Sequence, residues 1–240
     1  MRHLSTASLL GLILTAALAT VPAAGEPPVV ANQPEPGAKP IAYIPPLRGA
    51  PMTRVGGGTR GSIYVTILAL APDHTGLTVN AQPTLYWYAS KRVTVPVEFT
   101  LNDPQASRPL LETRLKGPFN PGIRSLPLSG YSLKSGIEYQ WSITLVFDEA
   151  QRSKDVVAGG TIRLVQPSSR LEADLRGADP RKMPVIYAAE GIWYDALAFL
   201  SQLIEANPAD KVLREQRAAL LEQVGLNAAA TDDRTRATRR

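Results

Sequence analysis

The sequence predicts a mainly β chain with α: an antiparallel, immunoglobulin-like β-sandwich over residues 62–166, then a C-terminal helical hairpin packed on it over 168–226. Two observations lead to this fold class. Up to residue 166, short runs of alternating apolar and polar residues recur between turns, with no helical period between them. After residue 168, apolar residues recur at spacings of three and four, which is the period of an amphipathic helix.

The N-terminal part precedes this folded region. Residues 1–24 run from Arg2 through an apolar stretch to small residues, the order of a secretory signal peptide. We expect export to the periplasm or cell envelope, with cleavage near Ala23. The apolar stretch is shorter than a membrane-spanning helix requires. Residues 25–61 hold eight prolines and seven glycines, which predicts an extended linker.

The sandwich is predicted from alternation with a period of two. Between 137 and 147, Tyr139, Trp141 and Ile143 alternate with polar residues, which places one face of this strand on a core. Because the chain has no cysteine and so no disulfide, we expect Trp87 and Trp141 at the centre of that core. Further strands are expected at 63–70, 84–89, 95–101, 110–115, 122–128 and 156–165.

Helices are expected after residue 168. Leu171 and Leu175 mark a short first turn, and the apolar pattern over 185–204 is divided by Gly191 into two helices. Asp210 is expected to cap a last helix that Gly225 ends. Residues 227–240 have no large apolar side chain, so we expect a disordered basic tail with weak contact to anionic envelope surfaces.

Composition excludes several kinds of chemistry. Without cysteine there is no thiolate nucleophile and no cysteine zinc site, and His74 is the only histidine outside the leader. We therefore expect no metal and no cofactor. The net charge of +5 is not gathered into a basic stripe with interleaved aromatics, so no nucleic-acid partner is expected.

Two groups of residues remain as catalytic candidates. His74 as a general base would need a positioned serine, and no Gly-x-Ser-x-Gly turn is present. Acidic residues could form a pair for sugar cleavage, although nothing in the sequence brings two of them together. These acidic residues are Glu98, Asp103, Asp148, Glu149, Glu190 and Asp195. We predict no catalytic residues.

Aromatic residues give the candidate binding site, at the seam between sandwich and helices. Alternation places Tyr86 and Tyr88 on one face of their strand, near Lys91 and Arg92. These rings could bind a partner or a sugar. Alternatively, the helices cover this face and pack Trp193 and Tyr194 on it, with Asp195 hydrogen-bonding across the seam. The predicted site comprises Tyr86, Tyr88, Lys91, Arg92, Trp193, Tyr194 and Asp195.

The helical region resembles a single tetratricopeptide unit. Tyr187, Gly191, Trp193, Ala196 and Pro208 have the spacing of that repeat's aromatic, glycine, aromatic, alanine and terminal proline positions. A stable array needs about three units. The resemblance therefore implies a helical appendage on the sandwich rather than a superhelix.

A second resemblance covers most of the mature chain. It rests on motifs in a fixed order: Gly-Gly-Gly-Thr-Arg-Gly at 56–61, Leu-Ala-Pro at 70–72, Gly-Leu-Thr at 76–78, Pro-Thr-Leu-Tyr-Trp-Tyr at 83–88, Val-Glu-Phe-Thr-Leu at 97–101, Tyr-Gln-Trp at 139–141, Gly-Ile-Trp-Tyr-Asp-Ala at 191–196 and a closing Leu-Leu at 220–221 followed by Val-Gly-Leu at 224–226. This order is similar to an exported, largely cyanobacterial family, domain of unknown function 928. The resemblance implies an envelope or periplasmic location and carries over no catalytic residues.

The expected function is a non-catalytic binding or scaffolding protein of the periplasm or cell envelope. Its partner is expected to be a protein or an envelope polysaccharide, bound at the seam or at a sheet edge. The alternative is a hydrolase that acts on envelope polysaccharide or peptide through loop carboxylates.

Overall fold

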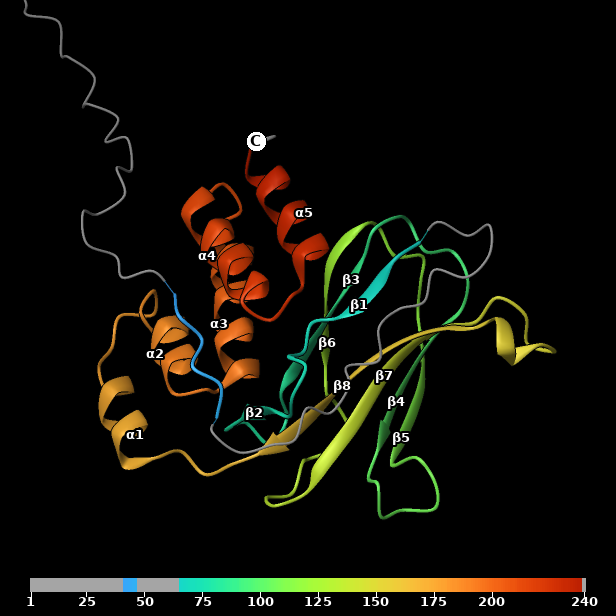
Figure 1. Cartoon of the computed structure of the whole chain (residues 1–240), viewed down its shortest axis with the longest axis horizontal. Helices are drawn as coiled ribbons and strands as arrows, with labels where there is room; N and C mark the ends of the chain where they lie inside the picture. The colour runs from blue at the N-terminus through green and yellow to red at the C-terminus, as the bar shows by residue number, and fades with distance from the viewer. Residues whose placement is uncertain (1–40, 47–64, 239–240) are drawn as a thin grey trace, which may run out of the picture. The chain divides into compact units, whose positions relative to one another are not determined.

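The computed structural model describes residues 41–46 and 65–238. The predicted signal peptide, its cleavage site and most of the predicted linker lie outside these residues. Within them, eight strands and a 3-10 turn, η1 (Arg152–Lys154), precede five α-helices, so the fold is mixed α/β with the helices at the C-terminal end (Figure 1).

The smaller sheet has three antiparallel strands. Its central strand, β3 (Thr84–Ala89), lies between β1 (Ile67–Ala69) and β6 (Gly122–Pro127). Trp87 of β3 faces Ala69 on one side and Arg124 on the other in the register. The bounds of β3 are those that the alternation predicts.

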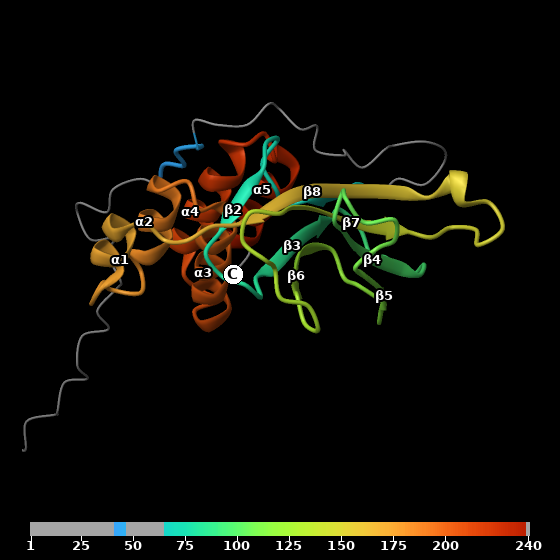
Figure 2. The same ribbon diagram turned by 90° about the horizontal axis from the view of Figure 1, so that it is seen from below.

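The larger sheet has five strands in the order β2-β8-β7-β4-β5. These are β2 (Gly76–Thr78), β8 (Val156–Leu164), β7 (Glu138–Leu145), β4 (Val97–Asn102) and β5 (Leu111–Leu115). Strands β8, β7, β4 and β5 are antiparallel neighbours, and Figures 1 and 2 show β5 at the edge. The purely antiparallel prediction is wrong for β2, which pairs with β8 in parallel. Its three residues are too few to show any period.

Alternation in the central strands is confirmed. Val97, Phe99 and Leu101 of β4 are buried, and the intervening residues are half-buried. In β7, Tyr139 and Trp141 are buried while Gln140 is exposed. Strand β3 differs because both of its faces are buried from Leu85 to Ala89. Helix α3 packs against β3, and buried residues of both belong to one hydrophobic core.

The helices begin and end at recognisable signals. They are α1 (Ser169–Leu175), α2 (Met183–Ala189), α3 (Trp193–Ala206), α4 (Lys211–Glu222) and α5 (Asn227–Thr238). The Asp210 carboxylate accepts from the backbone N–H groups of Val212 and Leu213, so it caps α4 as expected. Gly191 separates α2 from α3 with a φ of 74°, a conformation that favours glycine. A carbon atom added to this glycine would lie 2.8 Å from the Ile44 carbonyl oxygen.

The prediction of a disordered tail is wrong for residues 227–238, which form α5. Ala229 and Ala230 are fully buried, and Asp233 is 1% exposed. The Arg217 guanidinium donates to both Asp233 oxygens at 2.6 and 2.8 Å, and Arg214 donates at 3.1 Å. Disorder is predicted only because residues 227–240 have no large apolar side chain. This helix is instead held by small residues in close contact and by a buried ion pair.

Part of the predicted linker also packs into the fold. Residues 41–46 lack regular secondary structure, yet Ile41 and Tyr43 are buried. The backbone N–H of Tyr43 donates to Gln223 of the α4 C-terminus at 2.8 Å, and that of Ile44 donates to the Ala188 carbonyl at 3.0 Å. This segment therefore joins α2 and α4. Across 41–46 and 65–238, none of the helices combines the length and apolar character that a membrane span requires.

Candidate functional site

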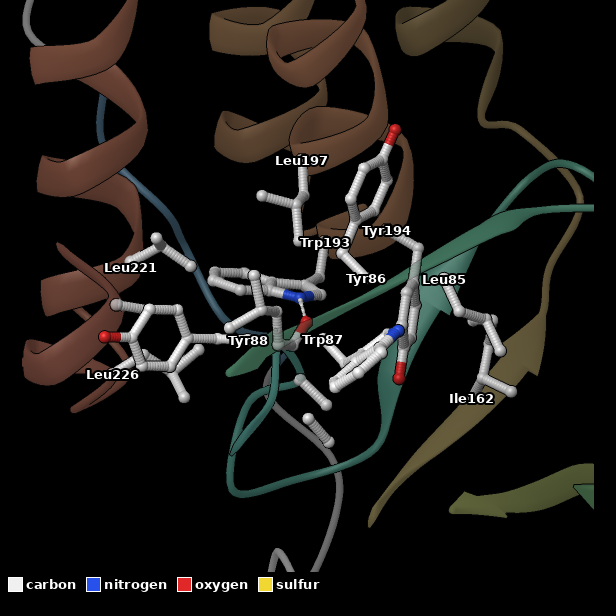
Figure 3. Packing of buried hydrophobic residues seen from close by; sticks show 14 of the residues in the cluster. Leu85, Tyr86, Trp87, Tyr88, Ile162, Trp193, Tyr194, Leu197, Leu221 and Leu226 are labelled. Carbon is white, nitrogen blue, oxygen red and sulfur yellow. Dashed lines mark hydrogen bonds between the residues drawn. The ribbon is translucent and has the colours of Figure 1, made fainter. Parts of the chain in front are cut away.

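The seam residues predicted as a binding surface form a core. Tyr86 and Tyr88 are 3% and 5% exposed, and Trp193 and Tyr194 are at most 1% exposed. Figure 3 shows these side chains gathered where β3 meets the helices. The second of the two sequence-based alternatives, in which the helices cover this face of β3, therefore applies to these residues. Lys91 and Arg92 differ, because both are exposed beyond the end of β3.

Buried hydrogen bonds join α3 to the strands across the seam. Trp141 Nε1 donates to the Tyr194 hydroxyl at 2.8 Å, and that hydroxyl donates to the Thr161 carbonyl at 2.9 Å. Trp193 Nε1 donates to the Leu70 carbonyl at 2.9 Å (Figure 3). Burial raises the pKa of Tyr194 above its ordinary value, so the phenol stays protonated as a donor. The polar atoms of these three side chains therefore have their hydrogen-bond partners inside the protein.

Two glycines let the seam close. A carbon atom added to Gly76 would lie 2.5 Å from a ring carbon of Tyr194. One added to Gly160 would lie 2.4 Å from the side chain of Ala71. Both separations are shorter than any ordinary carbon contact, so glycine lets β2 approach Tyr194 of α3 and lets β8 approach the segment that follows β1.

Asp195 is the one acidic residue of the predicted site, and it is 7% exposed. It lies in the first turn of α3, and its carboxylate accepts from the backbone N–H of Val79 at 3.1 Å. Burial raises the pKa of Asp195 to about 6, while hydrogen bonds from Thr78 and Val79 act in the opposite direction. The predicted bond across the seam is therefore present and joins α3 to the end of β2.

His74 forms a small polar cluster with Tyr43 and Asp73. Its Nε2 is 2.8 Å from the Tyr43 hydroxyl, and its Nδ1 is 3.1 Å from an Asp73 oxygen. The Tyr43 ring also contacts Trp193 edge to face, at 5.1 Å between centroids. Burial raises the pKa of Tyr43, and the Asp73 charge raises it further. Because both imidazole nitrogens have partners, His74 fastens residues 41–46 rather than offering a free base.

The exposed part of the predicted site lies beside a groove of about 460 Å³. Its lining residues come from the chain before β4 and the end of β5: Arg92, Thr94, Val95, Pro96, Arg114, Leu115, Gly117 and Pro118. Two cations and several aliphatic side chains are present in that lining, and no acidic residue is. The groove thus combines charge of one sign with apolar surface.

Tertiary contacts fix the position of the two chain segments that line the groove. Val93 and Phe119 exchange two backbone hydrogen bonds of 2.8 and 2.9 Å, which fixes the segment after β5 beside the segment before β4. The Phe119 ring packs edge to face on Trp87, with centroids 5.3 Å apart. The Gly117–Pro118 peptide is cis. The walls therefore rest on the buried core through Trp87.

Most of the chain matches one family model. Residues 55–234 match the model described as Domain of Unknown Function (DUF928). The chain belongs to this family. The match includes both sheets, the seam and the groove, as well as most of α5. No curated protein matches the chain.

In this family member, the acidic residues considered as catalytic candidates have polar partners. Glu98 contacts Arg152, and it shares Arg114 Nη2 with Glu149 at 3.4 and 2.8 Å. The hydrogen bond from Arg152 lowers the pKa of Glu98, as Arg114 also does. Asp148 pairs with Lys154, and Glu190 with Arg170. Asp103 accepts from the backbone N–H of Gln105 at 2.9 Å. Within residues 41–46 and 65–238, no three acidic or histidine side chains gather closely enough to hold a metal ion.

Sequence reasoning found Arg92 but missed the groove beside it. The groove exists because Val93 pairs with Phe119, residues that are far apart in the sequence. The residue types of Lys116-Gly117-Pro118 indicate a turn between strands. No local pattern indicates that this turn faces residues 92–96.

Proposed function

We propose that this chain is an exported, non-catalytic binding protein of the periplasm or cell envelope, and that its partner docks along β5 and the adjoining groove. The groove carries this proposal. In this groove, cationic and aliphatic side chains meet beside β5, whose central residues are exposed. Strands at a sheet edge present backbone groups to which another chain can add.

Chemistry at the other candidate positions favours binding over hydrolysis. An acid for glycoside cleavage needs a carboxyl group that holds its proton, and so a raised pKa. The Glu98 pKa is lowered by its arginine neighbours, which keeps this group ionised beside Glu149. Asp195 has a raised pKa but is buried against Val79. Neither group is suited to act as an accessible proton donor.

For the fold, we propose that the two sheets are the layers of one immunoglobulin-like sandwich. The support is a single hydrophobic cluster that contains Trp87 of the smaller sheet and Trp141 of the larger. In such a sandwich, the inner side chains of both sheets form the core. Export is proposed from the leader-like residues 1–24, and N-terminal sequencing of the mature chain tests the cleavage near Ala23.

Site-specific photo-crosslinking in cells that export the chain tests the docking surface. A photoreactive amino acid replaces Thr113 of β5, and a matched control replaces Val212 of α4; both positions are exposed. We expect a covalent adduct of defined mass at position 113 and none at 212. Adducts at neither position, at both equally, or at 212 alone contradict the proposed docking surface.

A further inference from the structure

Arg92 is placed to receive a ligand carboxylate. Its side chain is exposed and lines the groove, and within the described part of the chain no acidic oxygen lies within ion-pair distance of it. The other groove cation, Arg114, is already shared by Glu98 and Glu149. A ligand that enters therefore meets one guanidinium that bears no ion pair within residues 41–46 and 65–238. Guanidinium groups bind carboxylates through two parallel hydrogen bonds.

The rest of the groove favours a peptide over a sugar. Its apolar walls come from Val95, Pro96, Leu115 and Pro118, all of them aliphatic. Sugar-binding surfaces generally offer aromatic faces, and this lining has none. Aliphatic walls fit the side chain of a valine, leucine or proline.

Strand β5 supplies a third element. It ends the order of the larger sheet, so among residues 41–46 and 65–238 only its β4 side has a strand partner (Figure 2). Its central residues, Glu112 to Arg114, are exposed. Leu115, the last residue of β5, is also a wall of the groove. Val97 pairs with Leu115 and Val93 with Phe119, so the groove lies on the β4 side of β5, and a peptide added to the free edge of β5 would lie one strand away from residues 92–96.

We propose that the ligand of this surface is an extended peptide segment of a partner protein, which adds to the free edge of β5 and extends an acidic side chain across β5 to Arg92. The inference rests on the proposed function and specifies its partner. Strand addition accounts for affinity without sequence preference, and the carboxylate with its aliphatic neighbour accounts for selectivity.

Binding of a defined peptide tests this. The probe is a fluorescein-labelled peptide of nine residues, alternating serine and valine around one central glutamate, with a matched peptide that has glutamine at the centre. Fluorescence anisotropy is measured with the mature wild-type chain, with Arg92→Gln, and with Arg108→Gln. Arg108 is exposed and lies outside the groove lining, so its variant matches the charge change.

We expect the glutamate peptide to bind wild type and Arg108→Gln alike. The affinity should fall about tenfold with Arg92→Gln, and by a similar factor when the peptide carries glutamine. Raising NaCl from roughly 50 to roughly 500 mM should weaken the glutamate peptide more than the glutamine peptide.

Three outcomes overturn the inference. Equal binding of both peptides, with a β5 crosslink still formed in cells, leaves the docking surface in place and removes the carboxylate contact. Binding of an oligogalacturonate that depends on Arg92, while neither peptide binds, replaces the peptide with an acidic polysaccharide. Failure of every probe together with the absence of a crosslink at position 113 removes the proposed function as well.

Discussion

At the junction of sheets and helices, polar atoms are paired inside the protein, whereas at the β5 edge charged side chains meet in solvent. Tyr194 and Trp193 both donate to backbone carbonyls and are almost fully buried. Arg114 is about half exposed, and Arg92 is exposed. The contrast separates two uses of polar groups. Those of the junction fix the position of α3, and those of the edge remain accessible to a partner.

The largest expected effect is in the core of the junction. Trp141→Ala removes a fully buried indole and its bond to Tyr194, so it should lower the free energy of unfolding by roughly 3–5 kcal/mol. Gln140→Ala, on the opposite face of β7, should change it by less than about 0.5 kcal/mol. Urea unfolding gives both values. An unchanged midpoint for Trp141→Ala would place this residue outside the core.

Asp233→Ala should have an effect of similar size, because it leaves the buried Arg217 without its partner. We expect a loss of about 3–5 kcal/mol. Asp232→Ala, at a partly exposed pair with Arg236, should cost less than about 1 kcal/mol. If thermal unfolding shows the two variants to be equally stable, α5 does not contribute to the fold as the structure has it.

Asp195 should make stability depend on pH. Its native pKa of about 6 lies above the unfolded value near 3.9, so the native state holds the proton more tightly. The stabilisation from that proton is complete below about pH 4 and is lost as the pH rises through 6. Asp195→Asn, which stays neutral, should therefore gain on the order of 2–3 kcal/mol relative to wild type between pH 4 and pH 8. Denaturant titrations at both pH values measure this difference, and a constant difference contradicts it.

A smaller effect is expected where the N-terminal segment meets the junction. Tyr43→Phe removes the hydroxyl that faces His74 and keeps the ring on Trp193, so we expect a loss of about 0.5–1.5 kcal/mol. A double-mutant cycle with His74→Ala isolates the pair. Coupling close to zero would show that the two side chains act independently.

The smallest change in stability is expected at the groove. Arg92→Gln alters an exposed side chain that bears no ion pair within the described residues, and it should shift the free energy of unfolding by less than about 0.5 kcal/mol. Circular dichroism melting compares it with wild type. A large drop in the melting temperature would assign Arg92 a structural role like that of the junction residues.

The sequence predicts those parts of the fold that a local period describes. Alternation in β4 and β7 places Phe99 and Trp141 in the core, and Asp210 indicates the start of α4. Strand β2 could not be predicted in this way, because its pairing with β8 is a tertiary contact over three residues. Helix α5 could not be predicted either, because the partners of Asp233 lie in another helix.

Only part of the candidate site could be predicted from the sequence, because the rest depends on tertiary contacts. The aromatic pattern in the sequence indicates Tyr86 and Trp193 as site residues. Both lie in the seam, but they are buried there and belong to the core. Exposure cannot be inferred from a period of two when helices from a later part of the chain cover the outer face of β3. Arg92 is found only as a neighbour of these rings, while its groove depends on the contact between Val93 and Phe119.

Hydrogen–deuterium exchange of the mature chain, with and without the glutamate peptide, tests most directly whether recognition lies at the β5 edge. We expect slower exchange in residues 111–119 when the peptide is bound, because strand addition protects backbone N–H groups. Exchange over α3 should stay unchanged. Protection confined to residues 193–206, with none over 111–119, would rule out docking at β5 and place the binding surface at the seam.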